Sequence, residues 1–219
     1  MNKILIYNRD NFYIFLIVAI SFLLKFYYFL NLDSWFDEWN MIYTVDPNIS
    51  NKLTWERFYG DRGDGFLPEY YPPINAFLLK FFLKFTNYYT EYARIYSLIF
   101  GLSSSLLVYV LANRISGKKC AYISTIIFGL NLFIIWQSNE IRPHSFVLFF
   151  SLLNLIFFIK IIEKKNNFFL SVSYFLSSVL LLSSWPFALT IYFAKTIYIL
   201  INLKLKNIDY KKFFLLFCL

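Results

Sequence analysis

A succession of long apolar runs constrains this chain more than any other feature of its sequence. About 20 apolar residues cross the hydrocarbon core of a bilayer as a helix, and runs near that length cover residues 12–30, 92–112, 120–137, 145–162, 168–184 and 187–203. A further apolar run begins at Phe213. Because backbone polar groups in lipid must be paired within the chain, we expect an all-α integral membrane protein, a polytopic bundle of about six to seven transmembrane helices.

The composition excludes an ordinary soluble domain and argues against several kinds of site. Of the 219 residues, 59% are hydrophobic and 16% are charged, whereas about a quarter of the residues in soluble chains are charged. The net charge of +8 does not indicate nucleic-acid binding, because the basic residues form short clusters between apolar runs. The two cysteines lack metal-ligand spacing, so neither a zinc site nor a disulfide framework is predicted.

The basic clusters predict how the helices cross the membrane. Short cytoplasmic loops collect Lys and Arg. The run at 74–85 is short, follows Pro72-Pro73 and carries Lys80 and Lys84, so we expect an amphipathic helix along the outer interface. The later basic clusters then share one side with the N-terminus; they lie at 114–119, 160–165 and 204–212. This topology predicts a cell membrane protein with a cytoplasmic N-terminus and a long first outer loop at 31–91.

Two adjacent carboxylates, Asp37 and Glu38, follow the first apolar run and lie among aromatic residues. A structural explanation exists, since Ser34 and Asp37 have the spacing of a capping box that opens a surface helix. A capping box needs one acid, however, and neighbouring side chains on a helix point about 100° apart. In the alternative interpretation, one carboxylate takes a proton from an attacking hydroxyl group. The residues alone leave both interpretations open.

A second polar segment, Gln137 to His144, forms the short turn between two spans. Ionisable residues near the hydrocarbon boundary are costly, so Glu140 and Arg142 indicate either mutual pairing or a site. His144 is the only histidine of the chain. Because no metal-ligand set surrounds it in the sequence, we expect it not to bind a metal.

In their order along the chain, these segments resemble the GT-C fold membrane glycosyltransferases of the protein O-mannosyltransferase, aminoarabinose transferase and RgtA/B/C/D-like group. The resemblance extends over residues 31–165 and is carried by Asp37-Glu38, Tyr71-Pro72-Pro73, Arg94 with the following apolar run, Val108 to Lys119, and Gln137 to Pro143. Members of this group continue through further spans. The resemblance therefore implies that residues 1–219 are the N-terminal transmembrane module of a longer enzyme, truncated at their C-terminal end.

The resemblance also implies roles for individual residues. Asp37 would act as general base, and Glu38 would support it or help to bind a divalent metal ion in members that use one. Glu140 and Arg142 would line the same cavity. Tyr71 and His144 stand where the family has His and an aromatic residue, at positions expected to contact substrate.

Sugar transfer from a polyprenyl phosphate needs a carboxylate for the acceptor proton and cations for the departing phosphate. The basic candidates are Lys52, Arg57, Arg62, Arg94 and Arg142, although such side chains can also be solvated or reach the interface, which for Lys52 is the favoured explanation. We therefore expect an inverting glycosyltransferase, or a fragment of one, that transfers a sugar from a polyprenyl-phosphate donor to a protein, lipid or polysaccharide acceptor at the outer face of a lipid membrane. The alternative is a non-catalytic membrane protein that binds lipid-linked glycans, or an inactive truncated remnant.

Overall fold

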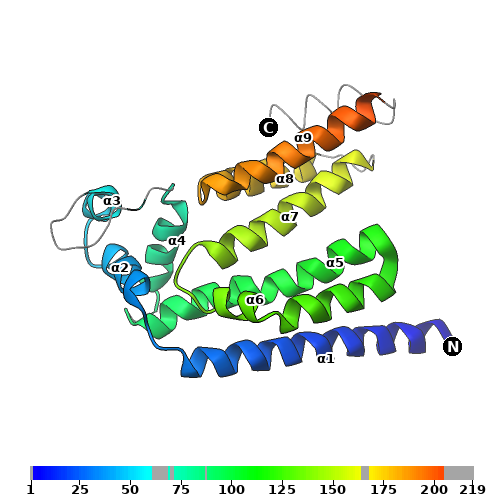
Figure 1. The fold of residues 1–219 in the computed structure, drawn as a ribbon, viewed down its shortest axis with the longest axis horizontal. Helices are drawn as coiled ribbons and strands as arrows, with labels where there is room; N and C mark the ends of the chain where they lie inside the picture. Colours follow the sequence, from blue (N-terminus) through cyan, green and yellow to red (C-terminus); the bar gives the residue numbers. More distant parts are fainter. Residues whose placement is uncertain (1, 61–68, 70–71, 87, 164–167, 205–219) are drawn as a thin grey trace.

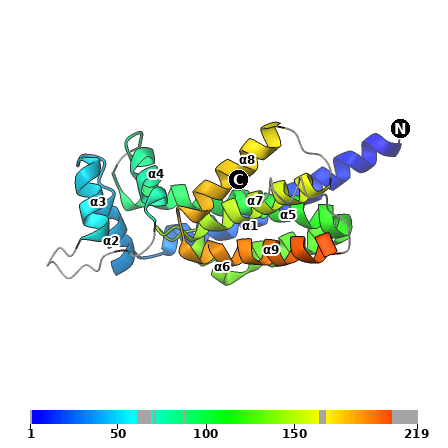
Figure 2. The same cartoon turned by 90° about the horizontal axis from the view of Figure 1, so that it is seen from above.

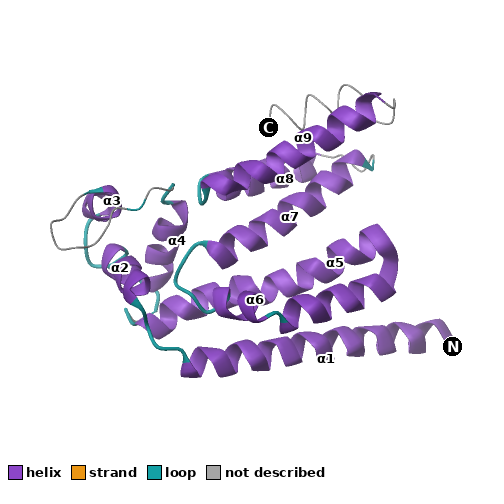
Figure 3. Ribbon diagram, viewed as in Figure 1, coloured by secondary structure: helices purple, strands orange, loops and turns teal. Residues whose placement is uncertain are grey.

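The computed structural model describes residues 2–60, 69, 72–86, 88–163 and 168–204, and within these ranges it contains helices and turns but no β-strand (Figure 3). The elements are α1 (Asn2–Asn31), α2 (Phe36–Thr44), α3 (Asn51–Tyr59), α4 (Ile74–Leu83), α5 (Thr90–Leu130), α6 (Leu132–Gln137), α7 (His144–Ile162), α8 (Phe168–Leu182), the 3-10 helix η1 (Pro186–Ala188) and α9 (Leu189–Lys204). The predicted all-α membrane bundle is thereby confirmed.

The described helices differ in their capacity to cross a membrane. Three are long and apolar enough to do so. They are α5, α7 and the part of α1 from Phe12 to Asn31. Ile74–Leu83, Phe168–Leu182 and Pro186–Ile201 are shorter apolar helices. Each of the six predicted spans coincides with one or more of these helices, and the run that begins at Phe213 lies outside the described residues.

Gly117 divides α5 into two arms that run in opposite directions (Figure 1). Its backbone has φ 80° and ψ 176°, a conformation that glycine adopts at little cost because it has no Cβ atom. The arms correspond to the predicted spans at 92–112 and 120–137. The second arm ends earlier than predicted, because the Asn131 side chain accepts a hydrogen bond from Ile134 N at 3.1 Å and starts α6.

The long helices pack side by side, with α5 against both α1 and α7, and α7 against α8 (Figures 1 and 2). A buried polar contact joins α1 to α5, where the Lys25 ammonium donates to Gly101 O at 2.9 Å and to Ser105 Oγ at 3.2 Å. Gly101 also meets Ser138 at very close range, so a Cβ added there would lie 2.3 Å from the serine Oγ. The helices are therefore fixed to one another by specific contacts as well as by apolar packing.

The short helices α2, α3 and α4 gather at the end of the bundle opposite to the N-terminus (Figure 1). Buried apolar side chains join them to the start of α5 and to the turn before α7, among them Met41, Phe58, Leu79 and Ile141. The turns at 131–143 and 183–188 lie at this same end, in agreement with the predicted sidedness (Figure 1). Which end faces outward remains a prediction.

The helix α4 runs across the end of the bundle, as expected for a segment that does not span (Figure 1). Its ten residues extend about 15 Å, half the thickness of a hydrocarbon core. Lys80, one of the two basic residues of this run, does not lie on a solvated face. Its ammonium is buried and donates to Ile49 O at 2.8 Å and Thr54 Oγ1 at 2.6 Å, which fastens α4 to the α3 segment.

Candidate active site

Glu38, in the first turn of α2, forms a buried ion pair with Arg94 of α5. Arg94 Nη2 lies 2.6 Å from Glu38 Oε2, and Arg94 Nε donates to Oε1 at 3.2 Å. The backbone N–H of Ile141 donates to the same Oε1 at 3.0 Å. The carboxylate therefore joins three segments that are far apart in the sequence.

Arg94 also holds the link between α1 and α2. Its guanidinium donates to Leu32 O at 2.5 Å, Asp33 O at 3.0 Å and Ser34 Oγ at 3.2 Å. The capping-box interpretation does not hold, because Trp35 is the N-cap residue of α2 and makes no side-chain cap hydrogen bond. Ser34 instead serves as an acceptor for Arg94. All three nitrogens of the guanidinium are thus engaged by protein oxygens, which leaves it poorly suited to the substrate-binding role that we expected.

Asp37, beside Glu38 in the sequence, has a different environment. Its Oδ2 accepts from Arg142 Nη2 at 2.8 Å, and the other end of the same guanidinium, Nη1, contacts Glu69 Oε1 at 2.5 Å. The Asp37 side chain is 34% exposed, whereas that of Glu38 is fully buried. Of the two adjacent acids, one is therefore enclosed and the other is accessible.

Glu140 is buried in the turn before α7, close to this cluster. Burial raises its pKa to about 7; the positive charge of Arg142 opposes this shift, while the negative charges of Glu38 and Asp37 add to it. Its Oε2 accepts no hydrogen bond among the described residues and lies 3.8 Å from His144 Nε2. The imidazole of His144 in turn packs edge-on against Trp185, with 5.3 Å between ring centroids. Glu140 therefore lies close to Arg142, Glu38 and Asp37; that Glu140 and Arg142 line one cavity stays a prediction.

The described residues do not provide an evident metal site. No group of three or more His, Cys, Asp or Glu side chains that could hold a metal ion occurs among them. Both oxygens of Glu38 already accept hydrogen bonds from Arg94, and one of them also from Ile141. The environment of Glu38 therefore does not fit the metal-ligand role considered for it, and we derive no step through a metal.

Two of the predicted phosphate and substrate residues lie outside the described residues, namely Arg62 and Tyr71. Arg57 is described, and it is engaged with Tyr43: its Nη1 donates to Tyr43 O at 2.7 Å and its guanidinium lies 3.9 Å from the ring centroid. Arg142 is consequently the predicted phosphate ligand that the structure places in contact with Asp37.

Sequence reasoning missed two participants in this cluster. Glu69 is one of many acids in the first loop, and no local pattern separates it from the others. The N–H of Ile141 carries no side-chain signal at all. Neither residue could be predicted from local sequence patterns, because each joins the cluster through a contact with a residue more than 70 positions away.

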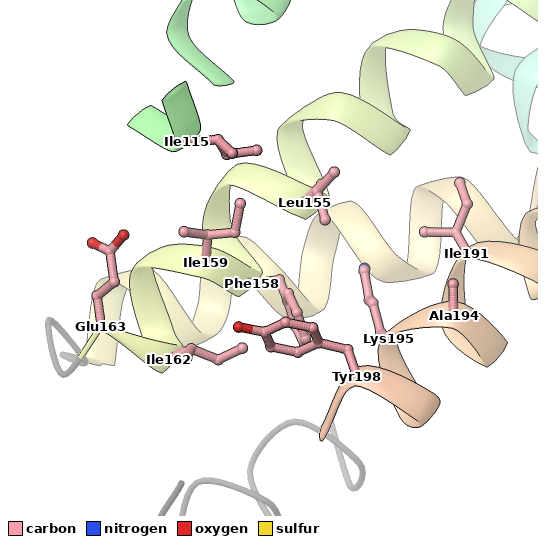
Figure 4. A pocket seen from close by; sticks show the side chains of 10 residues that line it. All are labelled: Ile115, Leu155, Phe158, Ile159, Ile162, Glu163, Ile191, Ala194, Lys195 and Tyr198. Carbon is pink, nitrogen blue, oxygen red and sulfur yellow. The ribbon is translucent and has the colours of Figure 1, made fainter. Parts of the chain in front are cut away.

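A separate cavity of about 570 Å³ lies between α7 and α9, and none of the predicted site residues lines it (Figure 4). Its walls are mostly apolar, with Leu155 and Ile159 on α7. Lys195 of α9 also lines the cavity, and its ammonium donates to Asn154 Oδ1 and lies 4.6 Å from the ring centroid of Tyr192. Lys195 thus faces protein groups, as expected for a charged residue within a span.

Comparison with known proteins identifies the family. Residues 71–219 match the family described as dolichyl-phosphate-mannose-protein mannosyltransferase. The chain belongs to this family. The matched segment contains Arg94, Glu140, Arg142 and His144 but begins after Asp37 and Glu38. No curated protein and no solved structure matched the chain significantly.

Membership of the mannosyltransferase family confirms the predicted resemblance to GT-C membrane glycosyltransferases. It supports a glycosyltransferase that uses a lipid-linked sugar donor. The roles of individual residues are not assigned by the match.

Proposed function

We propose that this chain forms the catalytic end of an inverting glycosyltransferase that takes a sugar from a polyprenyl-phosphate donor at the outer membrane face. The observation that carries the proposal is the environment of Asp37, a partly exposed carboxylate with one oxygen on Arg142. Oδ1 of Asp37 accepts no hydrogen bond from any residue that the structure describes. That oxygen is suited to receive a proton from an acceptor hydroxyl group.

The proposed reaction requires one proton transfer and one displacement. Asp37 Oδ1 takes the proton of the acceptor hydroxyl while the hydroxyl oxygen forms a bond to the anomeric carbon of the sugar. The bond between that carbon and the phosphate oxygen breaks, and the lipid phosphate leaves with the electron pair. Attack from the face opposite to the phosphate inverts the anomeric configuration.

Arg142 places a positive charge beside Asp37, and we propose that it helps to attract the anionic donor to this end of the protein. Because the attack is in line, the departing phosphate lies on the opposite side of the sugar from Asp37. Glu38 and Arg94 take a supporting role, since their mutual pairing fixes the start of α2, on which Asp37 is carried. We therefore propose Asp37 as the base and Glu38 as a positioning residue.

Transfer by the full-length protein in proteoliposomes tests the proposal. The assay follows radiolabelled mannose from dolichyl- or polyprenyl-phosphate mannose into peptide or glycan acceptors. Asp37→Asn should abolish transfer, since removal of a general base typically costs about 10²–10⁴-fold in rate. Glu56→Gln is the matched control, because Glu56 is an exposed acid in the same loop that pairs with Lys52.

Two outcomes would overturn the proposal. Full activity of Asp37→Asn would remove the assigned base. Binding of the lipid-phosphate donor by the wild-type protein without transfer would favour the non-catalytic alternative, a protein that binds lipid-linked glycans.

A further inference from the structure

We infer that Glu69 is a positioning residue for the Asp37 base: it holds one end of the Arg142 guanidinium and so limits that cation to a single oxygen of Asp37. The inference rests on the proposed role of Asp37. It concerns a residue outside the family match, which begins at residue 71.

The three side chains form a chain of contacts with Arg142 in the middle. Arg142 Nη1 lies 2.5 Å from Glu69 Oε1, and Nη2 lies 2.8 Å from Asp37 Oδ2. Glu69 is the more enclosed of the two acids, with 12% of its side chain exposed against 34% for Asp37. Asn40 Nδ2, one turn after Asp37 in α2, approaches the same Glu69 oxygen at 3.5 Å.

The shape of the guanidinium explains why a second acid matters. Its N–H groups form a planar fork that matches both oxygens of one carboxylate. With Glu69 in place, the two terminal nitrogens are directed to two different acids. Without it, both nitrogens could close on Asp37, and the oxygen that now accepts no hydrogen bond from the described residues would be occupied.

Charge acts in the same direction as shape. Among the described residues, Asp37 has Arg142 in contact, Glu69 across the guanidinium, and the ion pair of Glu38 with Arg94 beside it. Removing Glu69 takes away one of the carboxylates that attract the guanidinium and so favours its closer approach to Asp37.

The test measures kcat and the donor KM for Glu69→Ala, Glu69→Gln and the wild type, using the full-length protein and dolichyl- or polyprenyl-phosphate mannose as donor. For Glu69→Ala we expect kcat to fall about 10-fold or more, with the donor KM changed less than about twofold. Glu69→Gln should lie between the two, because its amide oxygen can still accept from Arg142 but carries no charge.

Glu56→Gln again serves as control and should match the wild type in both parameters. Thermal unfolding of each variant separates positioning from a general loss of structure. If Glu69→Ala does not fold, the charge effect is read from Glu69→Gln, which retains the size and the acceptor oxygen of the native side chain.

The inference is overturned if the Glu69 variants keep the wild-type kcat, or if their activity falls only in proportion to the folded fraction. Either result, together with an inactive Asp37→Asn, would remove the role of Glu69 and leave the proposed base intact. An active Asp37→Asn would instead remove the base itself.

Discussion

Glu38 and Arg94 form a buried ion pair, with 2.6 Å between Oε2 and Nη2 and almost no solvent contact for either side chain. The pair lies directly beside Asp37, whose carboxylate stays accessible. Two adjacent acids of the same chemical type therefore have different environments. The enclosed one holds three segments together, and the accessible one is the base that we propose.

Replacing Arg94 by Leu should destabilise the protein strongly. It leaves the Glu38 carboxylate buried without its partner, and breaking one side of a buried ion pair costs about 3–5 kcal/mol. Thermal unfolding in detergent would measure this loss. The double variant Glu38→Leu/Arg94→Leu should recover part of it, because no charge then remains unpaired; equal stability of the single and double variants would contradict the assignment.

Glu140 should make stability depend on pH. Because burial raises its pKa from 4.5 to about 7, the folded protein holds a proton that the unfolded chain releases. Stability contributed by this group is complete below the unfolded pKa and is lost as pH rises toward 7, by up to about 1.4 kcal/mol per unit. Unfolding midpoints measured from pH 4.5 to 8 should fall in the wild type and change less in Glu140→Gln. Parallel curves would rule out this contribution.

Gly101→Ala should disturb the contact between α5 and the turn before α7. The added Cβ would lie 2.3 Å from Ser138 Oγ and 2.5 Å from its Cβ, and overpacking of this kind typically costs about 1–3 kcal/mol. Ser138→Gly in the same chain removes both of these atoms and should restore most of the melting temperature. A Gly101→Ala variant as stable as the wild type would show that α5 and the segment that carries Ser138 can move apart at little cost in free energy.

The predicted sidedness can be tested by cysteine labelling in a Cys120→Ser/Cys218→Ser background. A cysteine at position 56 of α3 should react with an impermeant maleimide added to intact cells, whereas one at position 118, beside the Gly117 reversal, should react only after permeabilisation. Labelling of both positions from outside would mean that α4 crosses the membrane after all.

The fold was largely predictable because lipid permits few solutions. Long apolar runs specify helices, and the basic clusters predicted that the turn from Gln137 to His144 and the turn at 183–187 share one end, where the structure has the turns at 131–143 and 183–188. Local breaks were harder to predict. Asn131 ended one helix and capped the next, although the surrounding apolar residues suggested a continuous span.

The site was predictable only in part. Asp37, Arg142 and Glu140 could be named from chemistry and from the family resemblance, and the structure brings these three residues into one neighbourhood. The different environments of the individual residues could not be predicted. Glu38 and Arg94 look like ligands for a substrate or a metal ion until their mutual contact is known. Lys80 illustrates the same limit, because its burial depends on oxygen atoms supplied by residues 49 and 54.

The hydrogen bond from Ile141 N to Glu38 connects residues 103 positions apart, and this separation orders the assembly of the protein during synthesis. A nascent chain shorter than 141 residues lacks the donor that completes the pairing of the Glu38 carboxylate. The loop that carries Asp37 therefore reaches its final hydrogen bonding only after both arms of α5 have been made. Formation of the proposed catalytic end is in this way a late event, because it requires both Ile141 and Arg142.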